Sequence, residues 1–167
     1  WTVSSYHKID TNNDGEIQVS EALLIKYLNV SSSSIQSLEA ILNFTNLQYL
    51  NCNGNQLTSL NVQGLTNLQH LYCGGNQLPS LNMQGLTNLQ GLSCSYNQLP
   101  SLNVQGLTNL LTLYCNDNQL TSLFIKNGNT QSWNFLNLAN NPNLAYICAD
   151  EEDLTHIQQQ INNAGYS

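Results

Sequence analysis

Four cysteines recur at a fixed interval, and this interval constrains the fold of the chain more than any other feature. Cys52, Cys73, Cys94 and Cys115 follow one another in steps of 21 residues, and their neighbours keep the same register. From Leu47 the copies read LQYLNCNGNQLTSLNVQGLTN, LQHLYCGGNQLPSLNMQGLTN, LQGLSCSYNQLPSLNVQGLTN and a looser LLTLYCNDNQLTSLFIKNGNTQS. Self-similarity at a period of about 20 to 50 residues is typical of chains that stack one structural unit per repeat. We therefore expect a solenoid.

The copies share the pattern L-x-x-L-x-C-x-x-N-x-L, which is the leucine-rich-repeat pattern with cysteine in the third apolar slot. Each copy should supply one short strand, and successive strands should stack in parallel about 4.8 Å apart. One inward ladder then consists of Leu50, Leu71, Leu92, Leu113 and Leu136, and the cysteines form the next. A buried amide ladder that bonds the turning backbone is expected at Asn55, Asn76, Asn97, Asn118 and Asn141.

Two degenerate copies flank the regular ones. The first has Ser33 in place of the asparagine and fills its apolar slots with Ile25, Leu28, Val30, Ile35 and Leu38. The last runs from Trp133 through Leu136 and Leu138 to Asn141, and it follows a two-residue insertion, because Trp133 lies 23 residues after Leu110. The return segment LTSLNVQGLTN is too short, and in places too rich in Gly and Pro, for a regular helix.

The predicted fold class is an α/β solenoid. It is a leucine-rich-repeat right-handed coil with a parallel β-sheet on the concave face, 3₁₀ or extended turns on the convex side, and helical caps at both ends. We expect one structural domain, with a calcium-loop cap over residues 1–26, repeats over 27–147 and a capping helix over 148–167. In that helix Asp150 is the expected N-cap, Gly165 is the expected stop, and the buried face is formed by Leu154, Ile157 and Ile161.

The cysteine ladder itself is not expected to carry chemistry. Thiols stacked in register have a poor torsion for disulfides, and four sulfurs in a line cannot surround zinc tetrahedrally. We interpret them as small buried apolar groups. Cys148 is the fifth cysteine, lies outside the ladder, and is a candidate to pair with a segment that this chain lacks.

The segment DTNNDGEIQVSE, residues 10–21, matches the calcium-loop pattern D-x-[DN]-x-[DN]-G-x₅-E at every fixed position. Gly15 permits the sharp turn, and SEALLIKYL is expected to be the exiting helix, with Ala22, Leu23 and Ile25 available for burial. The expected Ca²⁺ ligands are Asp10, Asn12, Asp14, the Glu16 carbonyl, Gln18 and a bidentate Glu21. The alternative is a solvated acidic turn.

We expect this Ca²⁺ to be structural rather than regulatory. Calcium sensors pair two such loops and open a Met-rich groove, whereas this sequence shows one loop and a single Met. The loop also precedes the first strand, where an open solenoid would expose the edge of its core, and terminal repeats need a polar cap. The ion would hold the exiting helix over that edge.

Composition limits the classes of partner. The chain has 3 Lys plus Arg against 10 Asp plus Glu, for a formal net charge of -7. Nucleic acids and anionic membranes need cationic patches, so neither is an expected partner. No apolar run reaches the length of a membrane span, and the sequence shows no signal peptide at Trp1. The chain is expected either to be cytosolic or to have had its export signal removed.

The calcium loop, the 21-residue repeats and the closing segment NPNLAYICADEED together resemble the secreted leucine-rich-repeat proteins of Bacteroidetes. The resemblance covers nearly the whole chain. It implies a calcium-bound N-terminal cap, a secreted or cell-surface location, and a role in adhesion or protein recognition as a module of a longer exported protein. Such proteins commonly continue past the closing helix with a Cys-containing tail or a sorting domain, so the end at Ser167 suggests a fragment.

Residues that flank the inward Leu and Cys should point out of the sheet and form a recognition face, with Tyr96 and Asp117 at its rim. Tyrosines among Asn and Ser combine rigid rings with adaptable hydrogen-bonding groups, although aromatic pairs also stabilise sheets. The candidate ligand-binding residues are Tyr27, Tyr49, Asn51, His70, Tyr72, Ser93, Tyr114 and Phe135.

The predicted function is binding of a protein or glycan by a monomer through this face. A non-catalytic targeting module, or a spacer in a larger secreted enzyme or adhesin, is the alternative. No enzymatic activity is expected, because His7, His70 and His156 belong to no nucleophile or metal motif.

Overall fold

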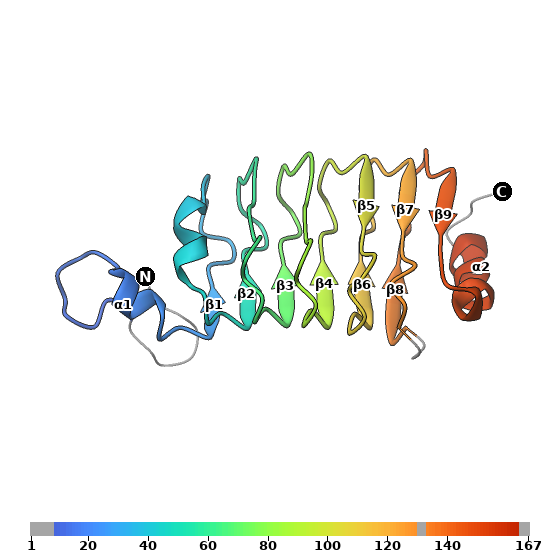
Figure 1. The fold of residues 1–167 in the computed structure, drawn as a ribbon. Coiled ribbons are helices and arrows are strands. Elements are labelled where there is room, and N and C mark those ends of the chain that lie inside the picture. The colour runs from blue at the N-terminus through green and yellow to red at the C-terminus, as the bar shows by residue number, and fades with distance from the viewer. Residues whose placement is uncertain (1–8, 130–132, 164–167) are drawn as a thin grey trace.

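The computed structural model describes residues 9–129 and 133–163, which form a solenoid with two parallel sheets along its length. The larger sheet has six strands in the order β1-β2-β3-β4-β6-β8. Figure 1 shows this sheet along one side of the coil, with one strand from each turn. Its strands are β1 (Tyr27–Asn29), β2 (Tyr49–Asn51), β3 (His70–Tyr72), β4 (Gly91–Ser93), β6 (Thr112–Tyr114) and β8 (Phe135–Asn137).

A second sheet of three strands runs along the opposite side of the coil, at the top of Figure 1. It contains β5 (Ser101–Asn103), β7 (Ser122–Phe124) and β9 (Tyr146–Cys148). The prolines explain why this sheet begins at β5. Thr121 donates its backbone N–H to Pro100 O at 2.8 Å, but Pro100 has no N–H to donate to Pro79, one repeat earlier.

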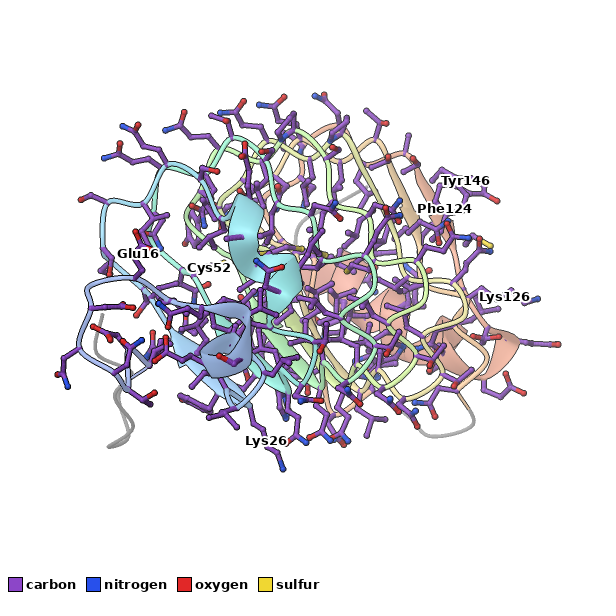
Figure 2. All side chains as sticks on the ribbon, turned by 60° about the vertical axis from the view of Figure 1, so that its left-hand side comes forward. Glu16, Lys26, Cys52, Phe124, Lys126 and Tyr146 are labelled. Carbon is purple, nitrogen blue, oxygen red and sulfur yellow. The ribbon has the colours of Figure 1, made fainter. Side chains whose placement is uncertain are left out.

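The predicted ladders inside the coil are confirmed. Leu28, Leu50, Leu71, Leu92, Leu113 and Leu136 are paired in register along the larger sheet. All four ladder cysteines are buried and unpaired, and Figure 2 shows Cys52 within the coil while Tyr146 and Lys126 lie at its outer surface. One continuous core extends from Ile9 to Ile157, because each coil covers the apolar surface of the next.

The asparagine ladder is also buried, and Asn97 shows how it works. Its Oδ1 accepts the Leu78 N–H at 2.9 Å, while its Nδ2 lies 3.1 Å from Cys73 O, 3.0 Å from Cys94 O and 3.3 Å from Ser95 O. Each amide therefore joins the turn of its own coil to the turn of the coil before it. An apolar residue could not satisfy these buried backbone groups.

The N-terminal helix is shorter than predicted. It is α1 (Val19–Ala22), and it ends before Ile25 because the chain must extend into β1 two residues later. Ala22 and Ile25 are buried as expected, but Leu23 is 39% exposed, so its predicted burial is wrong. A 3₁₀ helix, η1 (Glu39–Asn43), occupies the return side of the first coil.

The C-terminal cap is helical as predicted, but its details differ. It comprises η2 (Glu151–Asp153) and α2 (Leu154–Asn163), and Gly165 lies outside the described residues. Asp150 at the N-cap makes no side-chain capping bond; its Oδ2 instead accepts the Gly128 N–H at 3.0 Å. Leu154 is 55% exposed, so its predicted burial is wrong, whereas Ile157 is buried. No helix in the described part of the chain is long and apolar enough to cross a membrane.

Candidate functional site

All eight predicted ligand-binding residues lie on the outward side of the six-stranded sheet, which we call the six-strand face. Successive residues of a strand point to opposite sides of a sheet, so the buried leucine at the centre of each strand leaves its two neighbours outside. The first column of outward residues is Tyr27, Tyr49, His70, Gly91, Thr112 and Phe135. The second column is Asn29, Asn51, Tyr72, Ser93, Tyr114 and Asn137.

Aromatic rings form a connected cluster over β1, β2 and β3. The Tyr27 and Tyr49 rings are stacked with centroids 4.0 Å apart and planes 9° apart. Tyr72 meets Tyr49 edge-on at 5.3 Å and stacks loosely with His70 at 6.2 Å. Such contacts hold the rings in place on neighbouring strands, so the cluster presents a preorganised surface.

A second aromatic pair lies over β6 and β8. The Tyr114 and Phe135 rings are stacked with centroids 4.5 Å apart, and Phe135 is 45% exposed. Between the two groups, β4 contributes only Gly91 and Ser93. A Cβ at Gly91 would lie 2.9 Å from His70 Nδ1, so the glycine makes room for the imidazole of the neighbouring strand.

Burial raises the pKa of two tyrosines of this face, Tyr49 and Tyr72. Desolvation, followed by the hydrogen bond with Tyr27, raises the pKa of Tyr49 to about 12. Desolvation also raises the pKa of Tyr72. These hydroxyls therefore stay protonated near neutral pH and can donate and accept hydrogen bonds, which suits recognition rather than nucleophilic attack.

The turns that follow the strands form the rim of the six-strand face. Ser95 Oγ donates to Asn116 Oδ1 at 2.6 Å, and Asn116 Nδ2 donates to Asp117 Oδ2 at 2.6 Å. Asn140 Nδ2 donates to Asp117 Oδ1 at 2.8 Å. Tyr96 and Asp117 lie at this rim as predicted, and Tyr96 is 62% exposed.

The first part of the predicted calcium loop has the hydrogen bonds of a folded loop. Asp10 Oδ2 accepts the Gly15 N–H at 3.2 Å, and Gly15 has the left-handed φ of +90° that the sharp turn requires. Asn12 Oδ1 accepts the Asp14 N–H at 3.0 Å, and Asp14 Oδ1 accepts the Glu16 N–H at 2.9 Å. Asp10 Oδ1 is buried and has no hydrogen-bond partner.

Glu21, the last predicted ligand, is engaged elsewhere. Its Oε1 accepts the Thr11 N–H at 2.6 Å and the Thr11 hydroxyl at 2.7 Å, and its Oε2 accepts the Gln18 N–H at 3.1 Å. These bonds, the Thr11 hydroxyl first, lower the pKa of Glu21. Among the described residues no three His, Cys, Asp or Glu side chains are arranged to hold a metal ion. The carboxylate and amide oxygens from Asp10 to Gln18 are of the kind that Ca²⁺ prefers, and Asp10 Oδ1 has no donor. The oxygens of Asp14, Gln18 and Glu21 all accept hydrogen bonds, which a bound ion would have to replace.

The buried thiols have no arrangement for catalysis. Desolvation raises the pKa of Cys52 and of Cys115 to about 12, so these thiols are protonated. Cys94 Sγ and Cys115 Sγ each lie 3.5 Å from a backbone carbonyl of the next coil, on Tyr114 and Asn137. The cysteines therefore act as small core residues.

The two described histidines lie on different elements. His7 lies outside the described residues, and His70 is on β3. His156 is on α2, beside an open pocket of about 320 Å³ that β8 and Gln160 also line. The Asp153 carboxylate interacts with His156, but in the described part of the chain neither ring belongs to a group of three side chains that could hold a metal ion.

The sequence prediction missed the aromatic pair of the second sheet. Phe124 on β7 and Tyr146 on β9 have ring centroids 5.6 Å apart, and Tyr146 is 53% exposed. Phe124 follows the buried Leu123 in SLF, and Tyr146 precedes the half-buried Ile147 in YIC, so each aromatic residue flanks an inward residue. This alternation was the available sequence signal, but it identifies an outward face only if a second sheet is assumed. This pair lies on the opposite side of the coil from the six-strand face.

No protein-family model matches the sequence, and a search of curated proteins found no match. Solved structures do match. A leucine-rich-repeat protein of Leptospira interrogans is 25% identical, with a TM-score of 0.62, over 85% of this chain and 36% of that chain. The leucine-rich repeat domain of APL1B is 20% identical, with a TM-score of 0.62, over 80% of this chain and 41% of that chain.

An internalin of Listeria monocytogenes is 24% identical, with a TM-score of 0.52, over 80% of this chain and 50% of that chain. The chain thus spans about half or less of the length of these three structures. The similarity to these structures, together with the parallel strands described above, confirms the predicted leucine-rich-repeat solenoid. The chain has the leucine-rich-repeat solenoid fold.

Proposed function

We propose that this chain is a recognition module that binds a protein through the six-strand face. The observation that carries the proposal is the array of aromatic and amide side chains on six adjacent strands, held by ring contacts and supported by a continuous core. Tyrosine gives large rigid contacts at small entropic cost, and Asn and Ser adapt their hydrogen bonds to the partner. The solved neighbours have a fold that is used mainly for such non-catalytic interaction.

Catalysis has no support from the residues of this face. Its titratable groups are tyrosines whose pKa values are held up by burial, in Tyr49 and Tyr72, and one imidazole without a nucleophile beside it. We therefore propose a module without enzymatic activity of its own. A glycan is the alternative ligand, since aromatic rings flanked by amides also suit sugars. A spacer or targeting role would leave the face without a ligand.

We propose a secreted or cell-surface location, a role in adhesion, and a monomeric state. One support is the resemblance of the repeats and the closing segment to secreted proteins. The other is the polar surface, which depends mostly on uncharged amides and hydroxyls because charged residues make up only 8% of the chain. The negative charge of the chain disfavours self-association and binding to anionic membranes.

The test compares two sets of aromatic substitutions. Tyr49, Tyr72 and Tyr114 are replaced together by Ser on the six-strand face, and Phe124 and Tyr146 are replaced by Ser on the second sheet as the matched control. Binding of the purified chain to host cells, matrix proteins and a glycan array is measured for each. We expect the triple variant to lose binding and the control to keep it. Binding that survives the triple change, or loss in both variants, would contradict the proposal.

We also propose that Ca²⁺ binds in the loop of residues 10–21 and stabilises the N-terminal cap. The ligands would be Asp10, Asn12, Asp14, Glu16, Gln18 and Glu21. Glu21 would exchange its hydrogen bonds with Thr11 and the Gln18 N–H for the ion, which would supply fixed positive charge to the acidic loop. The supporting observation is the buried Asp10 Oδ1, which lacks a donor. The pKa of Asp14 is lowered, first by the hydrogen bond from the Glu16 N–H, which favours the charged form of this carboxylate.

Chelation tests this site. A ligand that binds only the native state stabilises by mass action, so we expect EDTA to lower the melting temperature by about 5 °C or more. Asp10→Ala with Glu21→Ala should remove that response, whereas Glu151→Ala with Glu152→Ala, two exposed carboxylates of the other cap, should keep it. A double loop variant that still responds to EDTA would place the ion elsewhere, and a wild-type chain that does not respond would exclude the site.

A further inference from the structure

One repeat position adopts the left-handed backbone conformation in every coil, directly before each residue of the asparagine ladder. The position, which we call the turn row, lies at the rim of the six-strand face. The residues of the turn row are Ser32, Gly54, Gly75, Tyr96, Asp117 and Asn140, with φ between 51° and 65°. Glycine adopts this conformation without strain, and Asn and Asp tolerate it. A bulky residue at this position is an outlier.

Tyr96 is that outlier, and its side chain has no core role. It has φ 55°, is 62% exposed, and none of the ring contacts in the described part of the chain includes it. Its backbone N–H donates to Asn116 O at 3.1 Å, a bond that any residue except proline would make. Gly54 and Gly75 hold the same position in the two preceding coils, so the turn does not need a ring. The ring itself is exposed and its hydroxyl bonds the neighbouring Asp117, and backbone strain at an exposed side chain is a feature of functional positions.

Asp117 follows Tyr96 in the turn row, one coil later. Partial desolvation acts to raise its pKa, but the hydrogen bonds from Asn116, Asn140 and the Tyr96 hydroxyl outweigh that effect, and the pKa lies below its usual value. These donors are neutral, so they leave a full negative charge beside an exposed ring. These three donors use part of the acceptor capacity of the two carboxylate oxygens, which offer about four lone-pair sites, so the carboxylate can accept a further donor.

None of the lysines in the described residues lies in the turn row, and Lys8 is outside those residues. Lys26 precedes β1, at the opposite end of the strands, and Lys126 follows β7 in the second sheet. The whole chain carries a formal net charge of -7. An exposed aromatic ring beside an ionised carboxylate, on a negatively charged protein, is complementary to a guanidinium group, which stacks on rings and bonds carboxylates with a planar fork.

We propose that Tyr96 and Asp117 form a binding site for an arginine side chain of the protein partner. This inference rests on the proposed recognition function, whose partner it specifies as a protein that presents an exposed arginine at the rim of the six-strand face. Tyr96 supplies the ring on which the guanidinium stacks, and Asp117 supplies the opposing charge. The strained tyrosine is retained for this contact.

The site is tested without the natural partner. N-acetyl-arginine N-methylamide is titrated into the ¹⁵N-labelled chain, with the uncharged citrulline analogue as the chemical control. We expect saturable shifts of the Tyr96, Asn116 and Asp117 amides with the arginine probe and none with the citrulline probe. Tyr96→Gly and Asp117→Asn should each weaken the arginine response by about fivefold. Ser32→Gly, which changes the same turn in the first coil, should leave it unchanged.

Melting temperatures separate a binding role from a packing role. Tyr96→Gly relieves the left-handed strain but also removes the exposed hydrogen bond from the Tyr96 hydroxyl to Asp117, so its melting temperature should stay within about 2 °C of the wild-type value. A fall of more than about 2 °C would show that the ring packs, and would overturn the inference. Absence of saturable shifts at these amides, or equal shifts with citrulline, would overturn it as well.

The two proposals fail separately. If the arginine titration fails while the Tyr49, Tyr72 and Tyr114 variant still loses its ligand, only the arginine site is wrong. If the titration succeeds while that triple variant keeps full binding, only the recognition role of the aromatic columns is wrong.

Discussion

Replacing Asn97 by Leu should be among the most damaging single changes in the coil. Leucine has nearly the shape of asparagine but can neither donate nor accept. The Leu78 N–H, which bonds only Asn97 Oδ1, would be left buried and unpaired. The three carbonyls that accept from Asn97 Nδ2 would each keep another donor: Asn76 for Cys73 O, Asn118 for Cys94 O and Gly75 for Ser95 O.

The magnitude follows from this count. One buried unpaired N–H costs about 1–3 kcal/mol, and each lost second bond to a carbonyl costs about 0.5 kcal/mol. The free energy of unfolding should therefore fall by about 3 kcal/mol, which corresponds to a melting temperature lower by about 6–12 °C for a chain of this size. The assay is urea unfolding followed by circular dichroism, read as a lower midpoint.

Asn88 provides the matched control. Its amide is exposed and makes one bond, from Nδ2 to Thr66 O at 2.9 Å. Asn88→Leu should lower the free energy of unfolding by less than about 1 kcal/mol. If Asn97→Leu costs no more than Asn88→Leu, the buried amide ladder does not hold the coils together and the reasoning is refuted.

Three further predictions follow from the core and the caps. Leu113→Ala removes a fully buried side chain of the leucine ladder and should cost about 2–5 kcal/mol in urea unfolding, and a cost below ~1 kcal/mol would show that Leu113 is not packed as described. Gly91→Ala places a Cβ where His70 Nδ1 lies at 2.9 Å, so the His70 ring resonances should shift by NMR, and an unmoved ring would contradict the close packing. Burial raises the pKa of Asp153, so the protein loses stability as the pH rises from 3.8 through the folded-state pKa of this carboxyl. Asp153→Asn can still accept the hydrogen bond from Trp133 Nε1, so it should be more stable than the wild-type chain at pH 7 and lose that advantage at pH 3. The reverse order in urea unfolding would refute the sign of the pKa shift.

The sequence predicted the ladders because their residues face the same environment once per coil. Leu, Cys and Asn at fixed spacing reveal which positions are inward, and a parallel sheet then places the residues on either side of each buried leucine outward. The eight candidate ligand-binding residues were found in this way, and the structure puts them on one face.

The sequence predictions failed in the second sheet and in the caps, where the 21-residue repeat pattern ends or is too short to identify strands. The three-residue strands of the second sheet are too short for alternation to distinguish them from an extended turn, and Pro79 and Pro100 lack the N–H groups that would extend the sheet to earlier coils. Leu154 is exposed because the bond from Trp133 Nε1 to Asp153 at 2.9 Å orients the cap, a contact across 20 residues that no local pattern shows. The strain at Tyr96 could have been found by comparing it with Gly54 and Gly75 at the same repeat position.

Thiol counting tests the central claim most directly, because a coil with its repeats facing inward hides four of its five cysteines. The native chain is treated with iodoacetamide, samples are taken over time, and intact mass and peptide mapping report which thiols have reacted. We expect one fast modification, at half-buried Cys148, and modification of Cys52, Cys73, Cys94 and Cys115 only after unfolding in guanidinium. Rapid labelling of any ladder cysteine under native conditions would contradict the coil described above.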